Sequence, residues 1–217
     1  MLYGIAHVLI SFLAKIFFHL RVNGLDHVPL EGPLIIAANH ASHLDIPLLG
    51  CTLPRRAYFV GKNELFRIPI LGRFLRYLGG IPIRRRGIDR GAVVEIKKQL
   101  EEGHLLVFYL EGSRTANGML QKAKAGVGMI AAMTGVQVVP AYIEGTYHVL
   151  PKGRKFFHLA PVTITYGAPV DLSHWRKPKG TKLDYQAMAD HIMKEIASLS
   201  GDQRKAEKAV LGTVGDL

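Results

Sequence analysis

The sequence predicts an α/β fold with a mostly parallel central sheet flanked by helices, preceded by an amphipathic helix at the amino terminus. Three short and continuously apolar segments, residues 33–38, 104–110 and 136–139, have the composition of strands buried on both faces. Segments with helical spacing alternate with them, as in layered α/β domains. The first two strands run directly into polar residues, and ligands of open α/β sheets bind beyond the carboxyl ends of the strands.

Size and charge restrict the class of protein. The chain has 217 residues, 48% of them hydrophobic, which is enough for one domain with a sizeable core. Its formal net charge of +11 indicates anionic partners such as nucleic acid, an anionic membrane or phosphorylated molecules. Basic clusters occur at 84–86 and 152–155, but no helix-turn-helix, zinc finger or aromatic RNA-binding motif accompanies them, so we expect no nucleic acid partner. One cysteine excludes an intramolecular disulfide.

We expect residues 1–20 to form an amphipathic, membrane-associating helix. His7, Ser11, Lys15 and His19 recur every four residues and therefore share one face, while the remaining surface is mostly apolar. Such a helix suits the headgroup region of a bilayer, where Lys15 can snorkel to water. A spanning helix needs about 20 apolar residues, and a signal peptide has a basic residue before its apolar run. The alternative is a helix docked on the protein's own core.

The polar residues after the first strand carry the strongest indication of chemistry. They are Asn39-His40-Ala41-Ser42-His43-Leu44-Asp45. A helix that begins at Ser42 or His43 would place Asp45 in its first turn, within hydrogen-bonding reach of His40. An imidazole that donates one nitrogen to a carboxylate keeps the other as a base near neutral pH. Ser42 has no Gly-x-Ser-x-Gly context and Cys51 lies in an apolar segment, so the nucleophile would be a substrate hydroxyl.

Two other interpretations of this segment stay open at this point. Asp45 could be a helix-cap carboxylate and His40 an ordinary loop histidine. A metal site of His40, His43 and Asp45 would lack the further ligands of a motif such as His-Glu-x-x-His, so we expect no metal. We interpret His43 as a surface or packing residue.

The other elements follow in chain order. We expect strands at 57–60, 79–83, 104–110, 136–139 (ended by Pro140) and 162–166, and helices at 64–78 (broken at Ile68-Pro69), 92–102, 126–134 and 185–199. The segment Gly126-Val127-Gly128-Met129-Ile130-Ala131 matches the dinucleotide pattern Gly-x-Gly-x-x-Ala. It follows polar residues 121–124 rather than a strand, so we assign it no nucleotide.

Four sequence blocks, in order, resemble the glycerolipid acyltransferase family, most closely its bacterial 1-acyl-sn-glycerol-3-phosphate acyltransferases. They are His40 to Asp45 (His-x4-Asp), 61–65 with 81–85, Glu111-Gly112-Ser113-Arg114 (similar to Glu-Gly-Thr-Arg) and 138–140. The chain departs from the pattern at Leu110, where a proline usually stands, at Ser113, which replaces threonine, and at Ala123, which replaces an aromatic residue. Serine keeps the hydroxyl that could contact a phosphate.

The resemblance implies a reaction at the first block. His40 would deprotonate a glycerol hydroxyl that attacks an acyl thioester, and Asp45 would orient the imidazole. A thiol leaves readily because its pKa, about 8.5, is far below that of an alcohol. One positioned base is then enough without a covalent acyl-enzyme.

The resemblance also implies a phosphate site for the acceptor. Arg114, with Gly112 and Ser113, would donate to the phosphate, since arginine binds such groups in a bidentate manner. Lys62 and Arg85 are further candidates. A carboxylate would repel the phosphate, so we expect Glu111 to pair with a nearby basic residue and hold the loop.

The implied function is a membrane-associated O-acyltransferase of phospholipid biosynthesis. Residues 1–20 would be the anchoring helix, 21–200 the catalytic domain and 201–217 a charged tail. Acyl-CoA or acyl carrier protein would be the co-substrate, with no cofactor, and 1-acylglycerol 3-phosphate the acceptor that becomes phosphatidic acid. The protein would be peripheral or monotopic at the cytoplasmic face of the inner membrane. The alternatives are another acceptor, such as glycerol 3-phosphate or a lyso-aminolipid, and a basic, non-enzymatic membrane- or nucleic-acid-binding protein.

Overall fold

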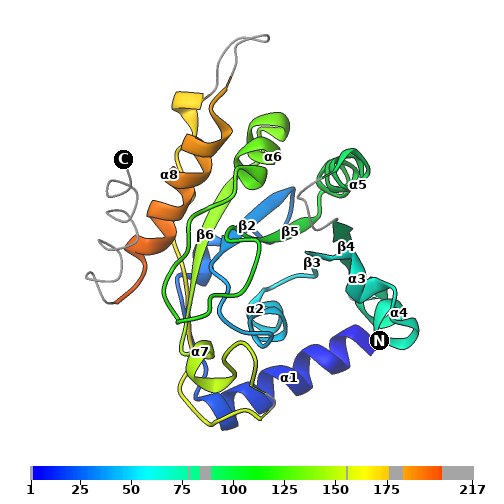
Figure 1. The fold of residues 1–217 in the computed structure, drawn as a ribbon, viewed down its shortest axis with the longest axis vertical. Helices are drawn as coiled ribbons and strands as arrows, with labels where there is room; N and C mark the ends of the chain where they lie inside the picture. Colours follow the sequence, from blue (N-terminus) through cyan, green and yellow to red (C-terminus); the bar gives the residue numbers. More distant parts are fainter. Residues whose placement is uncertain (1, 78, 84–88, 155, 176–182, 202–217) are drawn as a thin grey trace.

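A computed structural model of the chain shows a seven-stranded sheet between layers of helices (Figure 1). It describes residues 2–77, 79–83, 89–154, 156–175 and 183–201. The strands are β1 (Arg21–Asn23), β2 (Leu34–Ala38), β3 (Ala57–Lys62), β4 (Gly80–Ile83), β5 (Leu105–Tyr109), β6 (Val138–Glu144) and β7 (Thr163–Tyr166). The helices are α1 (Leu2–Phe18), α2 (Asp45–Thr52), α3 (Asn63–Phe66), α4 (Pro69–Tyr77), α5 (Arg90–Glu101), α6 (Gly126–Thr134), α7 (Thr146–Val149) and α8 (Tyr185–Ser198), with 3-10 turns η1 (Leu25–His27) and η2 (Ser173–Trp175).

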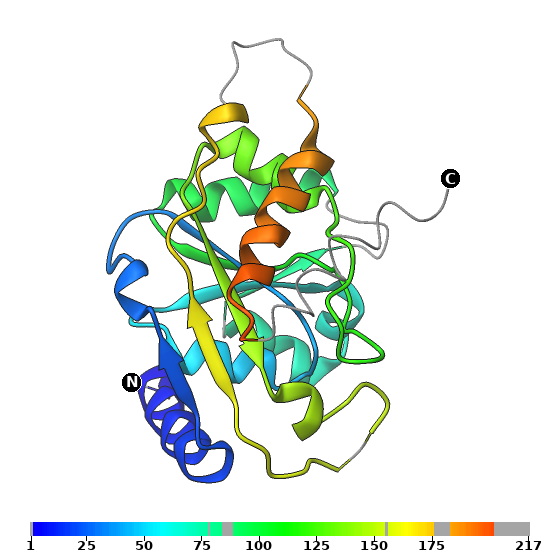
Figure 2. The ribbon, with the colours of Figure 1, turned by 90° about the vertical axis from the view of Figure 1, so that its left-hand side faces the viewer.

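The sheet order is β1-β7-β6-β2-β5-β3-β4. The five strands from β6 to β4 run parallel, β7 is antiparallel to β6, and β1 is parallel to β7. The predicted α/β class with a mostly parallel sheet is therefore confirmed. In the side view of Figure 2, α8 (orange) lies across the sheet.

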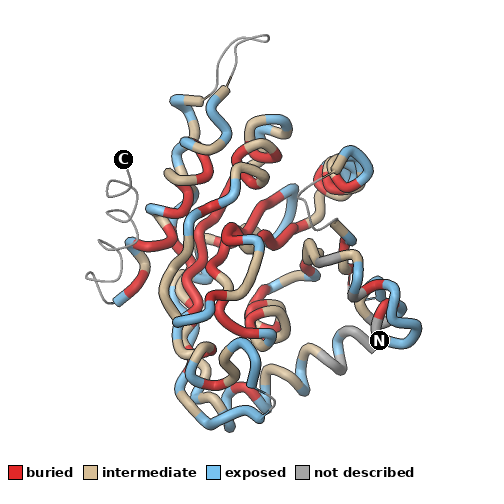
Figure 3. The backbone as a smooth tube through the Cα atoms, in the orientation of Figure 1, coloured by how far each residue is buried: buried red, intermediate tan, exposed pale blue. Residues whose placement is uncertain are grey.

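The sheet separates two hydrophobic cores, because successive side chains of a strand point to opposite faces. Ile35 and Ala37 of β2 face α5, α6 and α8, whereas Leu34, Ile36 and Ala38 face α1 and α2. All five residues of β2 are buried, which explains the unbroken apolar sequence of this strand (Figure 3).

The structure corrects one strand boundary. We expected Pro140 to end its strand, but β6 continues to Glu144. The Pro140 carbonyl accepts a hydrogen bond from the Gly167 amide at 2.8 Å, so the nitrogen of Pro140 also faces the β7 side. The missing N–H therefore removes no bond to β2, and the strand continues.

Other boundaries differ in smaller ways. Helix α2 begins at Asp45 rather than at Ser42 or His43. Strand β1 and helix α7 were not predicted, since three and four residues are too few for a recognisable period. Arg85 and the tail after Gly201 lie outside the described residues.

Helix α1 is present and docks in an unusual orientation. Its His7 ring contacts the Leu53 carbonyl oxygen at 3.3 Å, and the Ser11 hydroxyl donates to the Cys51 carbonyl at 3.1 Å. Half of the predicted polar stripe therefore faces the α2 region, and most of the apolar surface faces outward. Association with a membrane stays a prediction. In the described part of the chain, no helix has the length and apolar character needed to cross a bilayer.

Close packing of α6 on α8 explains the glycine-rich segment that matched the dinucleotide pattern. A Cβ atom on Gly128 would stand 2.2 Å from the Tyr185 carbonyl oxygen. The glycine therefore permits contact between two helices, and a nucleotide is not needed to account for it.

We expect Gly128→Ala to lower the free energy of unfolding by about 1–3 kcal/mol, because the added methyl group forces α6 and α8 apart. Urea denaturation measures this change. The matched control is Gly4→Ala in α1, where a Cβ meets nothing within 4 Å. Unchanged stability of Gly128→Ala would contradict the close approach.

Candidate active site

The candidate site lies where neighbouring parallel strands end. Strand β2 lies beside β5, with Ala38 opposite Tyr109. Beyond this pair, the Leu110 amide donates to the Ala38 carbonyl at 3.0 Å and the Thr115 amide donates to the His40 carbonyl at 2.9 Å. The register of the sheet thus brings the His40 segment against the Glu111 to Arg114 segment.

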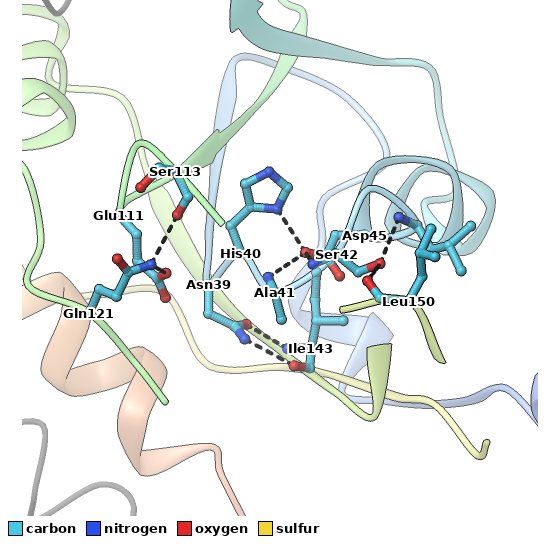
Figure 4. Close-up of polar contacts among 11 residues, drawn as sticks. Asn39, His40, Ala41, Ser42, Asp45, Glu111, Ser113, Gln121, Ile143 and Leu150 are labelled. Carbon is cyan, nitrogen blue, oxygen red and sulfur yellow. Dashed lines mark hydrogen bonds and ion pairs between the residues drawn. The ribbon is translucent and has the colours of Figure 1, made fainter. Parts of the chain in front are cut away.

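His40 and Asp45 form the hydrogen bond that the sequence suggested. The His40 Nδ1 atom lies 2.7 Å from Asp45 Oδ2 (Figure 4). The His40 side chain is 14% exposed and that of Asp45 is fully buried. Within the described residues, no hydrogen bond involves the His40 Nε2 atom. With Nδ1 donating to the carboxylate, Nε2 is the nitrogen available to a ligand.

The backbone holds Asp45 in position. The amides of Ala41 and Ser42 donate to the same Oδ2 atom at 2.7 and 2.8 Å. Three hydrogen-bond donors thus converge on one oxygen of this buried carboxyl group. The carboxylate is therefore bound to the loop that carries the histidine, beyond any role as a helix cap.

Tyr109 covers one face of the imidazole. The two ring centroids are 4.1 Å apart and the rings are inclined by 19°. Burial raises the pKa of Tyr109 well above its ordinary value, and the charge of Asp45 adds to this effect. Its hydroxyl is buried without a partner among the described residues. An aromatic ring stacked in this place restricts the orientation of the imidazole.

Two further contacts fix the His40 segment. The Asn39 side chain exchanges hydrogen bonds with the backbone of Ile143 in β6, at 2.9 and 2.7 Å. The Ser42 hydroxyl donates to the Leu150 carbonyl at 2.9 Å. Figure 4 shows both pairs below the imidazole. Ser42 is thus a structural residue, as the absence of a nucleophile motif suggested.

Glu111 differs from expectation. We expected a basic partner, but the hydrogen bond to its side chain comes from the Gln121 amide group at 2.7 Å, and the backbone of His40 adds another. Burial raises the pKa of Glu111 to about 7, and the charge of Asp45 contributes. An amide side chain and a backbone group thus stand in the place of the cation that we expected.

The remaining residues of this block surround Glu111. Gly112 has φ +66°, and a Cβ there would lie 2.9 Å from Lys124 Cδ, so the position needs glycine. The Ser113 carbonyl accepts from Gln121 at 3.1 Å. Arg114 is partly buried and immediately precedes Thr115, whose amide binds the His40 carbonyl.

The other predicted site residues are placed only in part. The backbone of Lys62 ends β3 at the same carboxyl edge of the sheet, whereas its side chain, like the whole of Arg85, is outside the described part. His43 is exposed, as interpreted from the sequence. No group of three or more His, Cys, Asp or Glu side chains suited to a metal ion occurs among the described residues.

Sequence reasoning missed three residues of this site: Tyr109, Gln121 and Lys124. Tyr109 belonged to a predicted strand, and only the register of β2 with β5 places it on His40. Gln121 and Lys124 come from the segment between β5 and α6, whose path no periodic pattern indicates.

Comparisons with known proteins agree with this arrangement. The family model described as "Acyltransferase" matches residues 19–144. A chloroplastic 1-acyl-sn-glycerol-3-phosphate acyltransferase of Arabidopsis thaliana is 33% identical over 64% of this chain and 40% of its own length. The 1-acyl-sn-glycerol-3-phosphate acyltransferase of Bacillus subtilis is 26% identical over 71% of this chain and 76% of that protein. The chain thus spans about two fifths of the length of the Arabidopsis relative.

A solved structure extends the similarity to the fold. The crystal structure of the 1-acyl-sn-glycerophosphate acyltransferase PlsC of Thermotoga maritima matches with a TM-score of 0.70 and 30% identity, over 93% of this chain and 78% of that one. The matched family segment includes β2, β5 and both blocks of the site. From this coverage and from the shared fold, we conclude that the chain belongs to the acyltransferase family.

Proposed function

We propose that this protein transfers a fatty acyl group from acyl-CoA or acyl carrier protein to the sn-2 hydroxyl of 1-acylglycerol 3-phosphate, forming phosphatidic acid. The names of the relatives support this acceptor. The observation that carries the proposal is the 2.7 Å contact of His40 Nδ1 with a buried, amide-bound Asp45 carboxylate. It fixes the tautomer in which Nε2 accepts a proton.

The reaction follows from that tautomer. His40 Nε2 takes the proton of the acceptor hydroxyl as its oxygen attacks the thioester carbonyl carbon. Asp45 stabilises the imidazolium, and the stacked Tyr109 ring adds to this from one face. When the tetrahedral intermediate collapses, the C–S bond breaks, and the thiolate takes a proton from the imidazolium. The acyl group is never attached to the protein during these reaction steps.

Arg114, Gly112 and Ser113 are proposed to bind the acceptor phosphate, with Lys62 and Arg85 as further cations. The support is position, since the amide after Arg114 is bonded to the His40 carbonyl. Glu111 lies in the same block, and a pKa of about 7 leaves its side chain partly neutral near neutral pH. A neutral acid repels a phosphate far less than a carboxylate does.

We further propose that the protein acts at the cytoplasmic face of the inner membrane as a peripheral or monotopic enzyme. The acceptor in this proposal is a membrane lipid, and the exposed apolar side of α1 supports contact with a bilayer. The net charge of +11 favours anionic lipids.

Removing the base should abolish turnover. We expect His40→Ala to lower kcat by about 10²- to 10⁴-fold, the range for a general base. The measurement is thiol release from acyl-CoA with a thiol-reactive dye. His43→Ala, an exposed histidine three residues away, is the matched control and should keep its activity. Normal thiol release by folded His40→Ala would refute the base assignment.

Removing the arginine should weaken acceptor recognition. We expect Arg114→Gln to lower kcat/KM for 1-acylglycerol 3-phosphate by about 10- to 100-fold, the worth of a hydrogen bond to a charged group. The control is Arg90→Gln on α5, which is exposed. An acceptor panel analysed by mass spectrometry completes the test. A preference of the unmodified protein for acceptors without phosphate would overturn this role.

The pKa of Glu111 predicts a dependence of stability on pH. Its value is about 7 in the folded protein, against an ordinary value of 4.5. Between these values the folded state binds more protons, so stability falls as pH rises from 4.5 to 7, by about 3 kcal/mol in total. We expect the stability of Glu111→Gln not to fall in this pH range. Urea denaturation at a series of pH values measures this. Glu101→Gln, exposed on α5, should keep the decline, and identical curves for Glu111→Gln and the unmodified protein would contradict the shift.

A further inference from the structure

The apolar surface of the protein is concentrated at the end that carries α1. The outward side chains of α1 are 39–68% exposed: Val8, Leu9, Phe12, Leu13, Ile16 and Phe17. They form one continuous stripe, since their spacing repeats every four residues. Exposed apolar surface of this extent is unfavourable in water and marks an interaction site.

A second segment continues this surface. We call residues 150–154 and 156–161 the aromatic loop, because they include Phe156 and Phe157, which are 81% and 61% exposed, followed by Leu159 at 64%. The loop follows α7 and leads to β7. Figures 1 and 2 both show it at the end of the molecule where α1 lies.

The aromatic loop is fixed to α1. The Phe157 ring meets the Phe18 ring edge to face, with centroids 6.3 Å apart. The Val162 amide donates to the Phe18 carbonyl at 2.8 Å. Phe157 therefore adjoins the carboxyl end of α1.

The charged residues carried by these two segments are basic. Lys15, Lys152 and Arg154 are exposed. The sequence has no Asp or Glu before Asp26, and none between Glu144 and Asp171. Apolar rings flanked by cations on the same segments match the layered chemistry of an anionic bilayer, with hydrocarbon beneath phosphate.

We propose that the aromatic loop is a second bilayer-inserting element, which seats Phe156, Phe157 and Leu159 in the interface of an anionic membrane beside α1. This rests on the proposed function in one respect, the membrane location. A second copy of the chain fits less well, because a symmetric contact would bring the like charges of Lys15, Lys152 and Arg154 together.

Insertion would also place the active site. The loop begins at Leu150, whose carbonyl accepts from the Ser42 hydroxyl at 2.9 Å. Ser42 is two residues from His40, and its amide binds the Asp45 carboxylate. One chain of contacts thus joins the inserted rings to the catalytic segment, so the hydroxyl of a lipid acceptor and the base are held at the same membrane surface.

Vesicle binding tests the proposal directly. We expect the double variant Phe156→Ser/Phe157→Ser of the full chain to bind phosphatidylglycerol vesicles at least about tenfold more weakly, because two aromatic side chains no longer leave water. Val94→Ser, which removes a 68% exposed side chain from α5, is the control and should bind normally. We expect Lys152→Gln/Arg154→Gln to weaken binding about fivefold per charge on these vesicles, with no change on phosphatidylcholine.

A second experiment measures how deeply the loop inserts, and it does not depend on a variant that binds more weakly. Phe157→Trp in a Trp175→Phe background has one tryptophan at the loop. We expect lipids brominated along the acyl chain to quench its emission. Absent quenching, or unchanged binding of the double phenylalanine variant, would overturn the inference and leave the proposed reaction intact.

The outcomes separate this inference from the proposed function. Vesicle binding is measured without substrate, so a protein that binds through the loop and releases no thiol refutes the reaction and supports the loop. An unmodified protein that binds no vesicles refutes the membrane location and the loop together. A dimer in light scattering that the phenylalanine substitutions dissociate would overturn the bilayer in favour of self-association.

Discussion

The hydrogen bond between His40 Nδ1 and Asp45 Oδ2 is the contact on which the proposed chemistry of this protein depends. A buried carboxylate is costly unless donors compensate it, and here two backbone amides and the imidazole share one oxygen. The same amides shape the turn between β2 and α2. The fold therefore positions the proposed base and its carboxyl partner with a single set of contacts.

The two carboxyl groups of the site illustrate how surroundings separate similar residues. Asp45 receives three donors on one oxygen, one of them from a histidine. Glu111 is also buried, but burial prevails over its hydrogen bonds and raises its pKa to about 7. The raised pKa of Glu111 reduces the negative charge in the block proposed to receive a phosphate.

Much of the fold could be predicted from periodic patterns, and the limits have physical causes. The buried strands β2 and β5 are continuous apolar segments, and Asn39 to Asp45 follows one of them directly. Contacts that depend on register could not be predicted: the stacking of Tyr109 on His40 requires the alignment of Ala38 with Tyr109. The amide partner of Glu111 was missed because Gln121 reaches it through an irregular segment. The strand boundary at Pro140 was wrong because the sequence does not tell which neighbouring strand the proline nitrogen faces.

Helix α1 shows that amphipathic spacing alone does not tell which face docks. Water could satisfy the polar groups of His7 and Ser11, yet both side chains bond to carbonyls at the end of α2. Turning His7 and Ser11 inward leaves the six apolar side chains outside, an arrangement that costs free energy in water and becomes favourable once hydrocarbon replaces it. The aromatic loop likewise exposes apolar rings to solvent, and it begins at Leu150, whose carbonyl accepts a hydrogen bond from Ser42. The proposed membrane contact would bring the six apolar side chains of α1 and the rings of the aromatic loop into the interface where the hydroxyl of a lipid acceptor lies.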